Sequence, residues 1–335
     1  MAHLASSLLL LVGPCLALVQ PTSLRNSALV FLKPHASTDA LEEFLRGKLA
    51  TAGVQVLDTG SKLADEIERD KLIDRHYGSL AKLAMDTDPE TIALTPAASE
   101  AFASAYGVQW ADATGSMLRN DAALSRLGVD GMELESLWRG GVQVKLAPGT
   151  YISRLALPDD TLFTVNGFYP AMRQKFIEEG ASIRYFVCDF DEAQLSWAAF
   201  RREVIGATNP KDALPGSARA ELLEKWRELG LDEEPTQGLN GVHASAGPLE
   251  GLKERCVWTG ATIESDGFGA QLLAAGVDRD TLMEWLEDNP VVTMGGSTDK
   301  VRTGHPPRRP VTPPPIHPAT YPSRHTATPP PPPPP

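Results

Sequence analysis

The stretch ALVFLKPHASTDALEEFLRGKLATAGVQVLDT, at residues 28–59, sets the architecture of this chain. Its first five residues, 28–32, form a compact apolar run typical of a buried strand. Ser37 or Thr38 can cap a helix whose leucines recur at helical spacing until Gly53 stops it. Residues after this glycine read as a second strand. We therefore predict that the chain begins with a β–α–β unit.

The alternation of strands and helices is interrupted at residues 86–165 and then returns. Short helical patterns in this interval are followed by a run punctuated by glycine and proline, which predicts an inserted helical or irregular subdomain. Beyond it we expect helices at 169–179, 195–205 and 217–229 and a strand at 183–190. The predicted parts are a split core domain at 28–85 and 166–260, the insertion at 86–165 and a helical extension at 261–294.

The two ends of the chain have unusual compositions. Residues 1–20 contain a short apolar run that ends in small and turn-forming residues, which predicts a signal or targeting segment for the secretory route, or for a plastid reached through it. The alternatives are an uncleaved anchor, or a mispredicted start and a cytoplasmic protein. The tail at 295–335 holds 15 of the 28 prolines and is predicted to be disordered or polyproline II. A ligand for a proline-recognition domain, an inert tail and a gene-model artefact are its alternative interpretations.

Charge and cysteine content exclude several classes of protein. The formal net charge of −12 argues against nucleic acid as the main partner. No apolar run besides the N-terminal one suggests a membrane span. Cys188 and Cys256 lie in apolar runs that look like strands, so we expect two buried free thiols, with one disulfide as the alternative. Their spacing matches no zinc site.

The stretch Asn240-Gly-Val-His243-Ala-Ser245 places a histidine in a short polar turn. Glu254 follows His243 by eleven residues and could fold back against it. A carboxylate bound to one ring nitrogen fixes the tautomer and makes the other nitrogen a better nucleophile. His243 is therefore a candidate nucleophile, and a structural or solvated histidine is the alternative.

Four further motifs carry cations, a hydroxyl and a phenol, which together suit a polyphosphate. They are Lys33-Pro34, His76-Tyr77, Arg202 with Gly206-Ala-Thr208-Asn-Pro210, and Pro215-Gly-Ser-Ala-Arg219. Arginine and lysine would neutralise phosphate oxygens, and Mg²⁺ would bridge two phosphates. The alternative makes the arginines solvated helix charges, the tyrosine a core-edge aromatic and the lysine a strand-end charge. The histidines at 35 and 76 are expected to be structural or surface residues.

The order of these motifs resembles the nucleoside diphosphate kinase family. That family has Lys-Pro-Asp at the end of its first strand, His-Tyr at a helix end, Arg six residues before Thr, a second Arg eleven after that Thr, Asn-x-x-His-Gly-Ser, and Glu eleven past the His. Here the interval from Arg202 to Thr208 is six, from Thr208 to Arg219 eleven, from Asn240 to His243 three, and from His243 to Glu254 eleven. The resemblance covers about half of the chain, residues 28–85 and 166–258.

The resemblance implies an α+β fold, a ferredoxin-like βαββαβ sandwich with an antiparallel four-stranded sheet. It also implies that the histidine takes the γ-phosphoryl group of a nucleoside triphosphate on Nδ1 and passes it to a nucleoside diphosphate. The implied catalytic residues are His243, Glu254, Ser245, Lys33 and Tyr77. The implied nucleotide-binding residues are Lys33, Arg202, Thr208, Arg219 and Asn240. Mg²⁺ would be bound through the nucleotide phosphates without a protein ligand, and a homo-oligomer is expected unless the insertion blocks that assembly.

The chain departs from the family pattern at several positions. His35 replaces the aspartate, and Ala244 follows the histidine, where we expect its methyl to hinder close approach of phosphate. Ala246 and the next glycine replace further polar residues. The insertion falls where the family has a base-stacking phenylalanine, and Phe168 or Tyr169 could take that place. These changes predict slower transfer, and they leave a catalytically weak nucleotide-binding or partner-docking protein as the alternative.

Overall fold

The computed structural model describes residues 25–147, 149–287, 291–294 and 297–300. The predicted targeting segment at 1–20 and the proline-rich residues 301–335 lie outside the described residues. Within the described part, no helix has the length and apolar character needed to cross a membrane.

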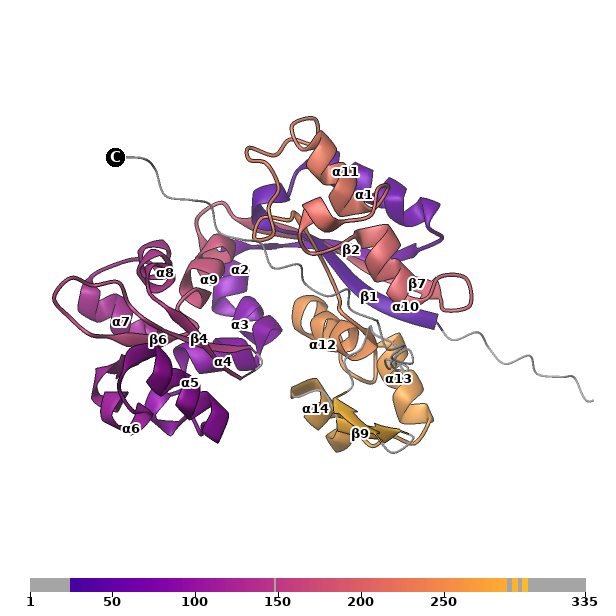
Figure 1. The fold of residues 1–335 in the computed structure, drawn as a ribbon. Helices are drawn as coiled ribbons and strands as arrows, with labels where there is room; N and C mark the ends of the chain where they lie inside the picture. Colours follow the sequence, from indigo (N-terminus) through magenta and orange to yellow (C-terminus); the bar gives the residue numbers. More distant parts are fainter. Residues whose placement is uncertain (1–24, 148, 288–290, 295–296, 301–335) are drawn as a thin grey trace, which may run out of the picture. The chain divides into compact units, whose positions relative to one another are not determined.

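One antiparallel sheet organises the core of the chain (Figure 1). Its strands are β1 (Arg25–Leu32), β2 (Gln55–Leu63), β7 (Ser182–Asp191) and β8 (Val242–Ala244). They lie in the order β2-β7-β1-β8, so β1 is central and pairs with β7 on one side and β8 on the other. With helical connections between the first and second and between the third and fourth of these strands, this is the ferredoxin-like βαββαβ order. The predicted fold class is confirmed.

Strand β1 contributes to a hydrophobic core on each side of the sheet, because successive side chains in a strand point to opposite faces. Val30 and Leu32 belong to the first core, with leucines of α1. Leu29 and Phe31 belong to the second core. The helical elements of the first core are α1 (Asp39–Thr51), α10 (Trp197–Ala199), the π-helical turn η4 (Phe200–Ile205) and α11 (Ala218–Lys225).

The second core covers the face of the sheet that carries the candidate site. Its helices are α2 (Ala64–Arg69), α3 (Leu72–Tyr77), α9 (Tyr169–Ile177) and α12 (Pro248–Thr259). Phe31 packs there with Phe176 and Trp258, which lie at ring-centroid distances of 6.4 and 5.3 Å. A ring that lies next to Phe31 on this face is therefore close to several aromatic side chains.

Helix α1 forms as its sequence predicts. The side chain of Thr38 accepts a hydrogen bond from the backbone N–H of Leu41 and caps the helix. Leu41, Leu45 and Leu49 recur every four residues and are fully buried. Gly53 follows with φ of +73°, the left-handed conformation that a helix end favours in glycine.

The insertion has the predicted helices, and it also has a sheet that the sequence did not predict. Strands β4 (Gln143–Ala147) and β5 (Thr150–Arg154) form a hairpin within the run expected to be irregular. Val144 and Leu146 are buried at alternate positions of β4. Two alternating apolar residues are too few to predict a strand in a run that also contains turn-forming glycine and proline. The sheet order is β3 (Met117–Leu118), β6 (Phe163–Val165), β5, β4. The helical elements are η2 (Pro89–Thr91), α5 (Pro96–Tyr106), α6 (Trp110–Ala113), η3 (Thr114–Ser116), α7 (Asn120–Leu127) and α8 (Gly131–Gly140).

Close backbone packing joins the insertion to the core domain. Helix α8 packs against α9, and a Cβ atom added to Gly131 would lie 2.8 Å from the backbone carbon of Pro170. The amide of Asn120 donates hydrogen bonds to the carbonyl oxygens of Ala84, at 2.9 Å, and Val165, at 3.0 Å. The insertion and the core therefore share buried contacts at more than one point.

The C-terminal extension contains α13 (Gly267–Ala274), α14 (Arg279–Glu287) and a hairpin of β9 (Val291–Met294) and β10 (Ser297–Lys300). Disorder was predicted from Gly295, and that prediction is wrong for residues 297–300. Residues 291–293 are β-branched and precede a Gly-Gly pair, which is a hairpin signal. The proline-rich composition of the following residues led to the prediction of disorder instead. The remaining short elements are η1 (Pro34–Ala36), α4 (Ser79–Met85) and η5 (Pro210–Asp212).

Both described cysteines are free thiols. Cys188 is buried in β7, as expected of a strand residue, and burial raises its pKa to about 12. Cys256 lies in helix α12, so the prediction that it belongs to a strand is wrong. Its apolar neighbours fill one face of a helix, which a short apolar run cannot distinguish from a strand.

Candidate active site

His243 lies on strand β8, where a polar turn was predicted. It is paired opposite Phe31 of β1, and the two rings stack with centroids 4.4 Å apart and planes 19° apart. Gly241, two residues earlier, has φ of +72°, and a Cβ there would lie 2.4 Å from a Leu222 side-chain atom. The turn therefore ends at this glycine. Pairing with β1 holds the next three residues in an extended strand, although the sequence around them is typical of a turn.

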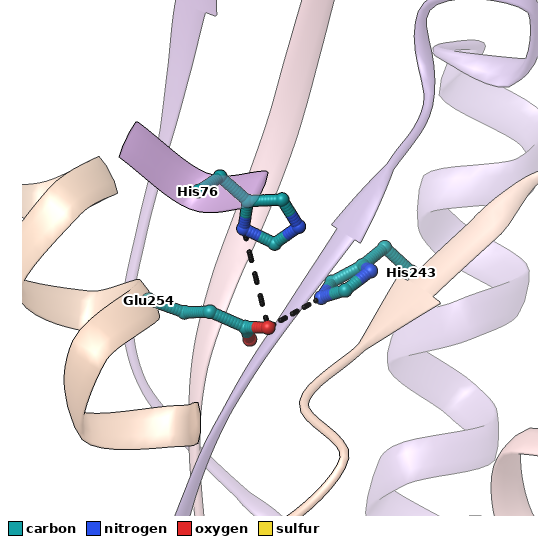
Figure 2. A group of neighbouring side chains, drawn as sticks. All are labelled: His76, His243 and Glu254. Atoms are coloured by element: carbon teal, nitrogen blue, oxygen red, sulfur yellow. Dashed lines mark hydrogen bonds and ion pairs between the residues drawn. The ribbon is translucent and has the colours of Figure 1, made fainter. Parts of the chain in front are cut away.

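Glu254 of α12 holds one nitrogen of the His243 ring (Figure 2). The Nε2 atom lies 3.0 Å from the Glu254 Oε1 atom, and the Ser245 hydroxyl donates to Oε2 at 2.6 Å. Because a carboxylate accepts, Nε2 carries the ring proton in the neutral form and the lone pair remains on Nδ1. No residue in the described ranges hydrogen-bonds to Nδ1. This is the geometry of a histidine prepared to act as a nucleophile through Nδ1.

The Glu254 carboxylate remains charged although its side chain is only 9% exposed. Burial alone would raise its pKa, but the charge of His243 and hydrogen bonds from His243 and Ser245 outweigh burial and lower the pKa to about 2. A fixed negative charge therefore lies against the His243 ring. It stabilises the positive charge that the ring gains when Nδ1 forms a new bond.

His76 is a site residue that the sequence interpretation left without a role. The indole N–H of Trp258 donates to His76 Nδ1 at 3.2 Å, so in the neutral ring Nε2 carries the proton. The rings of His76 and His243 meet edge to face at 4.8 Å. Burial, together with the charge of His243, lowers the pKa of His76 to about 3. The His-Tyr pair in the sequence was the only signal for this neutral neighbour.

His76, His243 and Glu254 offer ligand atoms that all lie within 4.8 Å of one another (Figure 2). Two nitrogens and one carboxylate suit a transition metal better than Mg²⁺, which prefers oxygen ligands in an octahedron. His76 Nδ1 already accepts from Trp258, and both Glu254 oxygens have partners. This cluster does not fit Mg²⁺, so the oxygens of a phosphate ligand are the better site for that ion.

Lys33 and Tyr77 line the same cavity. Lys33 follows Phe31 by two residues, which directs it to the same face, and its backbone N–H bonds to the Gly241 oxygen at 2.9 Å. Burial, with the charges of Arg219 and Lys175, lowers the Lys33 pKa to about 8. Within the described ranges its ammonium has no ion pair or hydrogen bond. Tyr77, whose pKa burial raises to about 12, keeps its proton and can donate.

The arginine that reaches the site is not the one that motif spacing predicted. Arg202 is exposed, and the preceding residue, Arg201, reaches the site instead. Arg201 donates to the carbonyl oxygens of Ala244, at 2.5 Å, and Ser245, at 3.3 Å. These two residues follow His243 directly, so Arg201 fixes the backbone that carries the candidate nucleophile.

The Arg219 side chain is hydrogen-bonded to the backbone of the site. It is 4% exposed and donates to the carbonyl oxygens of Gly206, at 2.8 Å, and Val242, at 2.7 Å. Burial, together with the charge of Arg201, lowers its pKa to about 10. Its Nε atom is buried without a hydrogen-bond partner among the described residues. Arg219 therefore supports the strand that carries His243, and its Nε–H group remains an unused donor among the described residues.

Asn240 and Thr208 are brought together, while the Thr208 side chain remains exposed. The Asn240 amide donates to the Thr208 carbonyl oxygen at 3.0 Å. The Oδ1 atom of Asn240 is buried and has no partner in the described part of the chain. An unused buried acceptor is suited to a hydroxyl or an ammonium of a ligand or neighbour.

The structure shows where the residues at two departures from the family pattern lie. Ala244 is buried in the core on the far side of the sheet from the histidine, so its methyl does not crowd a phosphate as expected. Phe168 lines a cavity with Lys33 and Tyr77. Tyr169 is fully buried and donates to Asp74 at 2.6 Å, which removes it as a base-stacking candidate.

No family model and no curated protein matches this sequence. Among solved structures, the chain is similar to a nucleoside diphosphate kinase from Encephalitozoon cuniculi, with 14% identity, 78% of this chain and 99% of that chain covered, and a TM-score of 0.32. A similar NDP kinase from Pyrobaculum aerophilum has 17% identity, coverage of 70% and 95%, and a TM-score of 0.32. A third, from Borrelia burgdorferi with bound vanadate and ADP, has 16% identity, coverage of 70% and 86%, and a TM-score of 0.30. The strand order of the sheet, β2-β7-β1-β8, identifies the fold.

Proposed function

We propose that this chain is a nucleoside diphosphate kinase-like phosphotransferase that works through a phosphohistidine on His243. The observation that carries this proposal is the His243 ring held at Nε2 by a buried carboxylate, with Nδ1 left unpaired among the described residues. Lys33, without an ion-pair partner in the described ranges, lies on the same face and supplies a cation for the phosphate. Nucleophile, orienting carboxylate and phosphate-binding cation are the groups that phosphoryl transfer requires.

In the first half of the cycle, Nδ1 of His243 attacks the γ-phosphorus of a nucleoside triphosphate. The Nδ1–P bond forms while the bond from phosphorus to the bridging oxygen breaks, and the nucleoside diphosphate leaves with that electron pair. Glu254 stabilises the positive ring, and Lys33 and Tyr77 donate to the transferred oxygens. In the second half, a terminal oxygen of another nucleoside diphosphate attacks the phosphorus and restores His243.

Mg²⁺, held by the nucleotide phosphates, would neutralise part of their charge. The protein groups assigned to the remaining charge are Lys33, Arg202 and the Nε atom of Arg219, and Asn240 Oδ1 is assigned to a sugar hydroxyl. Arg202 is exposed in the free protein, so this assignment requires its side chain to turn toward the bound nucleotide.

One observation favours a second candidate function, a nucleotide-binding protein with slow transfer. Arg219 donates from two of its nitrogens to backbone carbonyls, which leaves fewer guanidinium donors for the transferred phosphate. Fewer donors to the transferred group lower the stabilisation of the transition state, where its charge develops.

The test is incubation of the full chain with γ-labelled ATP and Mg²⁺, followed by acid and alkali treatment and mapping of the labelled peptide. We expect an acid-labile, alkali-stable label on the peptide that contains His243. His243→Asn should remove the label, while His317→Asn, outside the described residues, should retain it. Absence of label from the wild type, together with tight nucleotide binding, would support the second candidate and reject the first.

A further inference from the structure

We infer that helix α8 of the insertion forms one wall of the base-binding part of the nucleotide site, and that Glu135 on this helix selects a guanine-type base. This inference takes the class of ligand, a nucleoside diphosphate, from the proposed function. It adds a specificity-determining residue from a segment that the shared motifs do not include.

A cavity of about 190 Å³ connects the candidate catalytic residues with the insertion. Its lining includes Lys33, which follows β1, and Tyr77 of α3. Phe168 and Met172 come from the start of α9, and Glu135 comes from α8. Complete small-molecule sites typically measure about 300–1,000 Å³, so a cavity of this size is a subsite for part of a nucleotide. The Lys33 ammonium in this lining suits a phosphate, and the ring of Phe168 with the carboxylate of Glu135 suits a base.

The wall made by α8 is held firmly against the rest of the cavity. Trp138 of α8 contacts the ring of Phe168 edge to face at 5.5 Å, and its indole N–H donates to the Thr164 carbonyl oxygen at 3.1 Å. Gly167 allows this approach, because a Cβ there would lie 2.4 Å from a Trp138 ring atom. Phe168, the aromatic surface available to a base, is therefore positioned by the insertion itself.

Glu135 lies three residues before Trp138 on the same helix, with its side chain 19% exposed. Its Oε1 atom accepts from the guanidinium of Arg139, at 2.8 Å from Nε and 2.5 Å from Nη2. Its Oε2 atom has no partner among the described residues. Arg139 is 64% exposed, so this pair is weak and can rearrange around a ligand. The cavity thus presents a carboxylate acceptor beside a guanidinium donor.

The chemistry of the pair favours one base over the others. Guanine has two adjacent donors, N1–H and the N2 amino group, beside the O6 acceptor. A carboxylate can accept both donors while a guanidinium donates to O6. Adenine has an unprotonated N1 and one amino donor, so it would leave the carboxylate poorly satisfied and place a lone pair against it. A site that hydrogen-bonds a polar group of its ligand discriminates against an analogue that lacks that group.

The experiment is calorimetric titration of the full chain with GDP, IDP and ADP in the presence of Mg²⁺. We expect GDP to bind about tenfold more tightly than ADP, as one well-made bidentate contact provides. IDP lacks only the N2 amino group and should bind with intermediate affinity. Glu135→Gln should reduce the preference for GDP over ADP to about twofold. Glu100→Gln, which removes an exposed carboxylate of the insertion away from the cavity, should keep the wild-type preference.

Equal affinities of the wild type for GDP, IDP and ADP would overturn the inference, and so would an unchanged preference in Glu135→Gln. The comparison of GDP with IDP uses the wild type alone, so it is valid even if the variant folds poorly. Phosphohistidine formation is measured separately. Selective GDP binding without phosphohistidine would reject the proposed transfer and support the base pocket, whereas phosphohistidine with no base preference would do the reverse.

Discussion

The roles of the two site histidines are set by the groups that hold their ring nitrogens. Glu254 accepts a hydrogen bond from the Nε2–H group of His243, which leaves a lone pair on Nδ1. Trp258 donates to Nδ1 of His76, which places the proton of that neutral ring on Nε2. The same side chain is therefore a candidate nucleophile at one position and a neutral donor at the other.

Burial of neutral His76 should make the protein less stable in mild acid. Its folded pKa is about 3, while its unfolded pKa is near the ordinary value of 6.5. Between these values the unfolded chain binds more protons, so stability should fall as pH decreases below 6.5, by at most about 1.4 kcal/mol per pH unit. We expect a lower thermal midpoint at pH 5 than at pH 7, and a smaller difference in His76→Gln.

The low pKa of Glu254, about 2, also makes the folded protein less stable as the pH falls, but only below the ordinary carboxyl pKa of 4.5. Measurements at pH 5 and above therefore separate the two groups. An equal loss of midpoint in the wild type and in His76→Gln would contradict the assignment to His76.

At the scale of elements, the π-helical turn η4 explains why motif spacing and structure disagree about the arginines. A π-helix has more residues per turn than an α-helix, so it rotates the following side chains around the axis. Within η4, Arg201 faces the His243 strand and Arg202 faces solvent. Sequence spacing counts residues and does not detect such a rotation.

This difference predicts separate effects for two neighbouring substitutions. Arg201→Gln should lower the thermal midpoint and reduce phosphotransfer by about 10–100-fold, because it releases the backbone after His243. Arg202→Gln should leave the midpoint unchanged and act on the KM for nucleotide. Thermal unfolding and steady-state kinetics of both variants provide the measurement. Equal midpoints for the two variants would contradict the structural role of Arg201.

The contact between α8 and α9 depends on the absence of a side chain at Gly131. In Gly131→Ala the added methyl would meet the backbone of Pro170, so we expect a loss of about 1–3 kcal/mol from overpacking. Gly47→Ala in α1 is the matched control, because no atom lies within 4 Å of its added Cβ. That change should stabilise the protein by up to about 1 kcal/mol through helix propensity. Denaturant unfolding of both variants tests the difference, and equal stabilities would argue against close packing at Gly131.

At the scale of the whole molecule, the chain from residue 25 to 287 combines two four-stranded sheets that share buried contacts. The core sheet carries His243, and the insertion contributes its own sheet and helix α8. The hydrogen bond of Asn120 to Ala84 links the insertion to the segment where it leaves the core, and its bond to Val165 holds the last residue of the insertion. A partner-docking module attached by a flexible linker would lack such buried bonds.

Replacing residues 88–162 with a short glycine-serine linker should therefore damage the core as well as remove a surface. The change would expose the buried start of α9 and remove Glu135 from the cavity. We expect a lower thermal midpoint and weaker GDP binding, measured by calorimetry. An unchanged midpoint with unchanged nucleotide affinity would instead favour an independent docking module.

The sequence predicted the elements whose signals are local and repeated. Helix α1 has a cap, a leucine repeat and a terminal glycine, and strand β1 is an uninterrupted apolar run. The pairing of β8 with β1 and the hairpin of β4 and β5 were missed. Strands of three to five residues contain too few alternating positions to be recognised, and long-range pairing stabilises them.

By itself, the sequence determined the β–α–β beginning of the core through its hydrophobic periodicity, and its motif spacing carries the resemblance that implied the ferredoxin-like order and the candidate residues of the phosphate site. Only the tertiary structure decided which groups meet: His76 beside His243, Arg201 in place of Arg202, and Glu135 with Phe168 in one cavity. Those contacts join residues from different elements, and their geometry depends on strand pairing, on the rotation of a π-helical turn and on the close approach of α8 to α9.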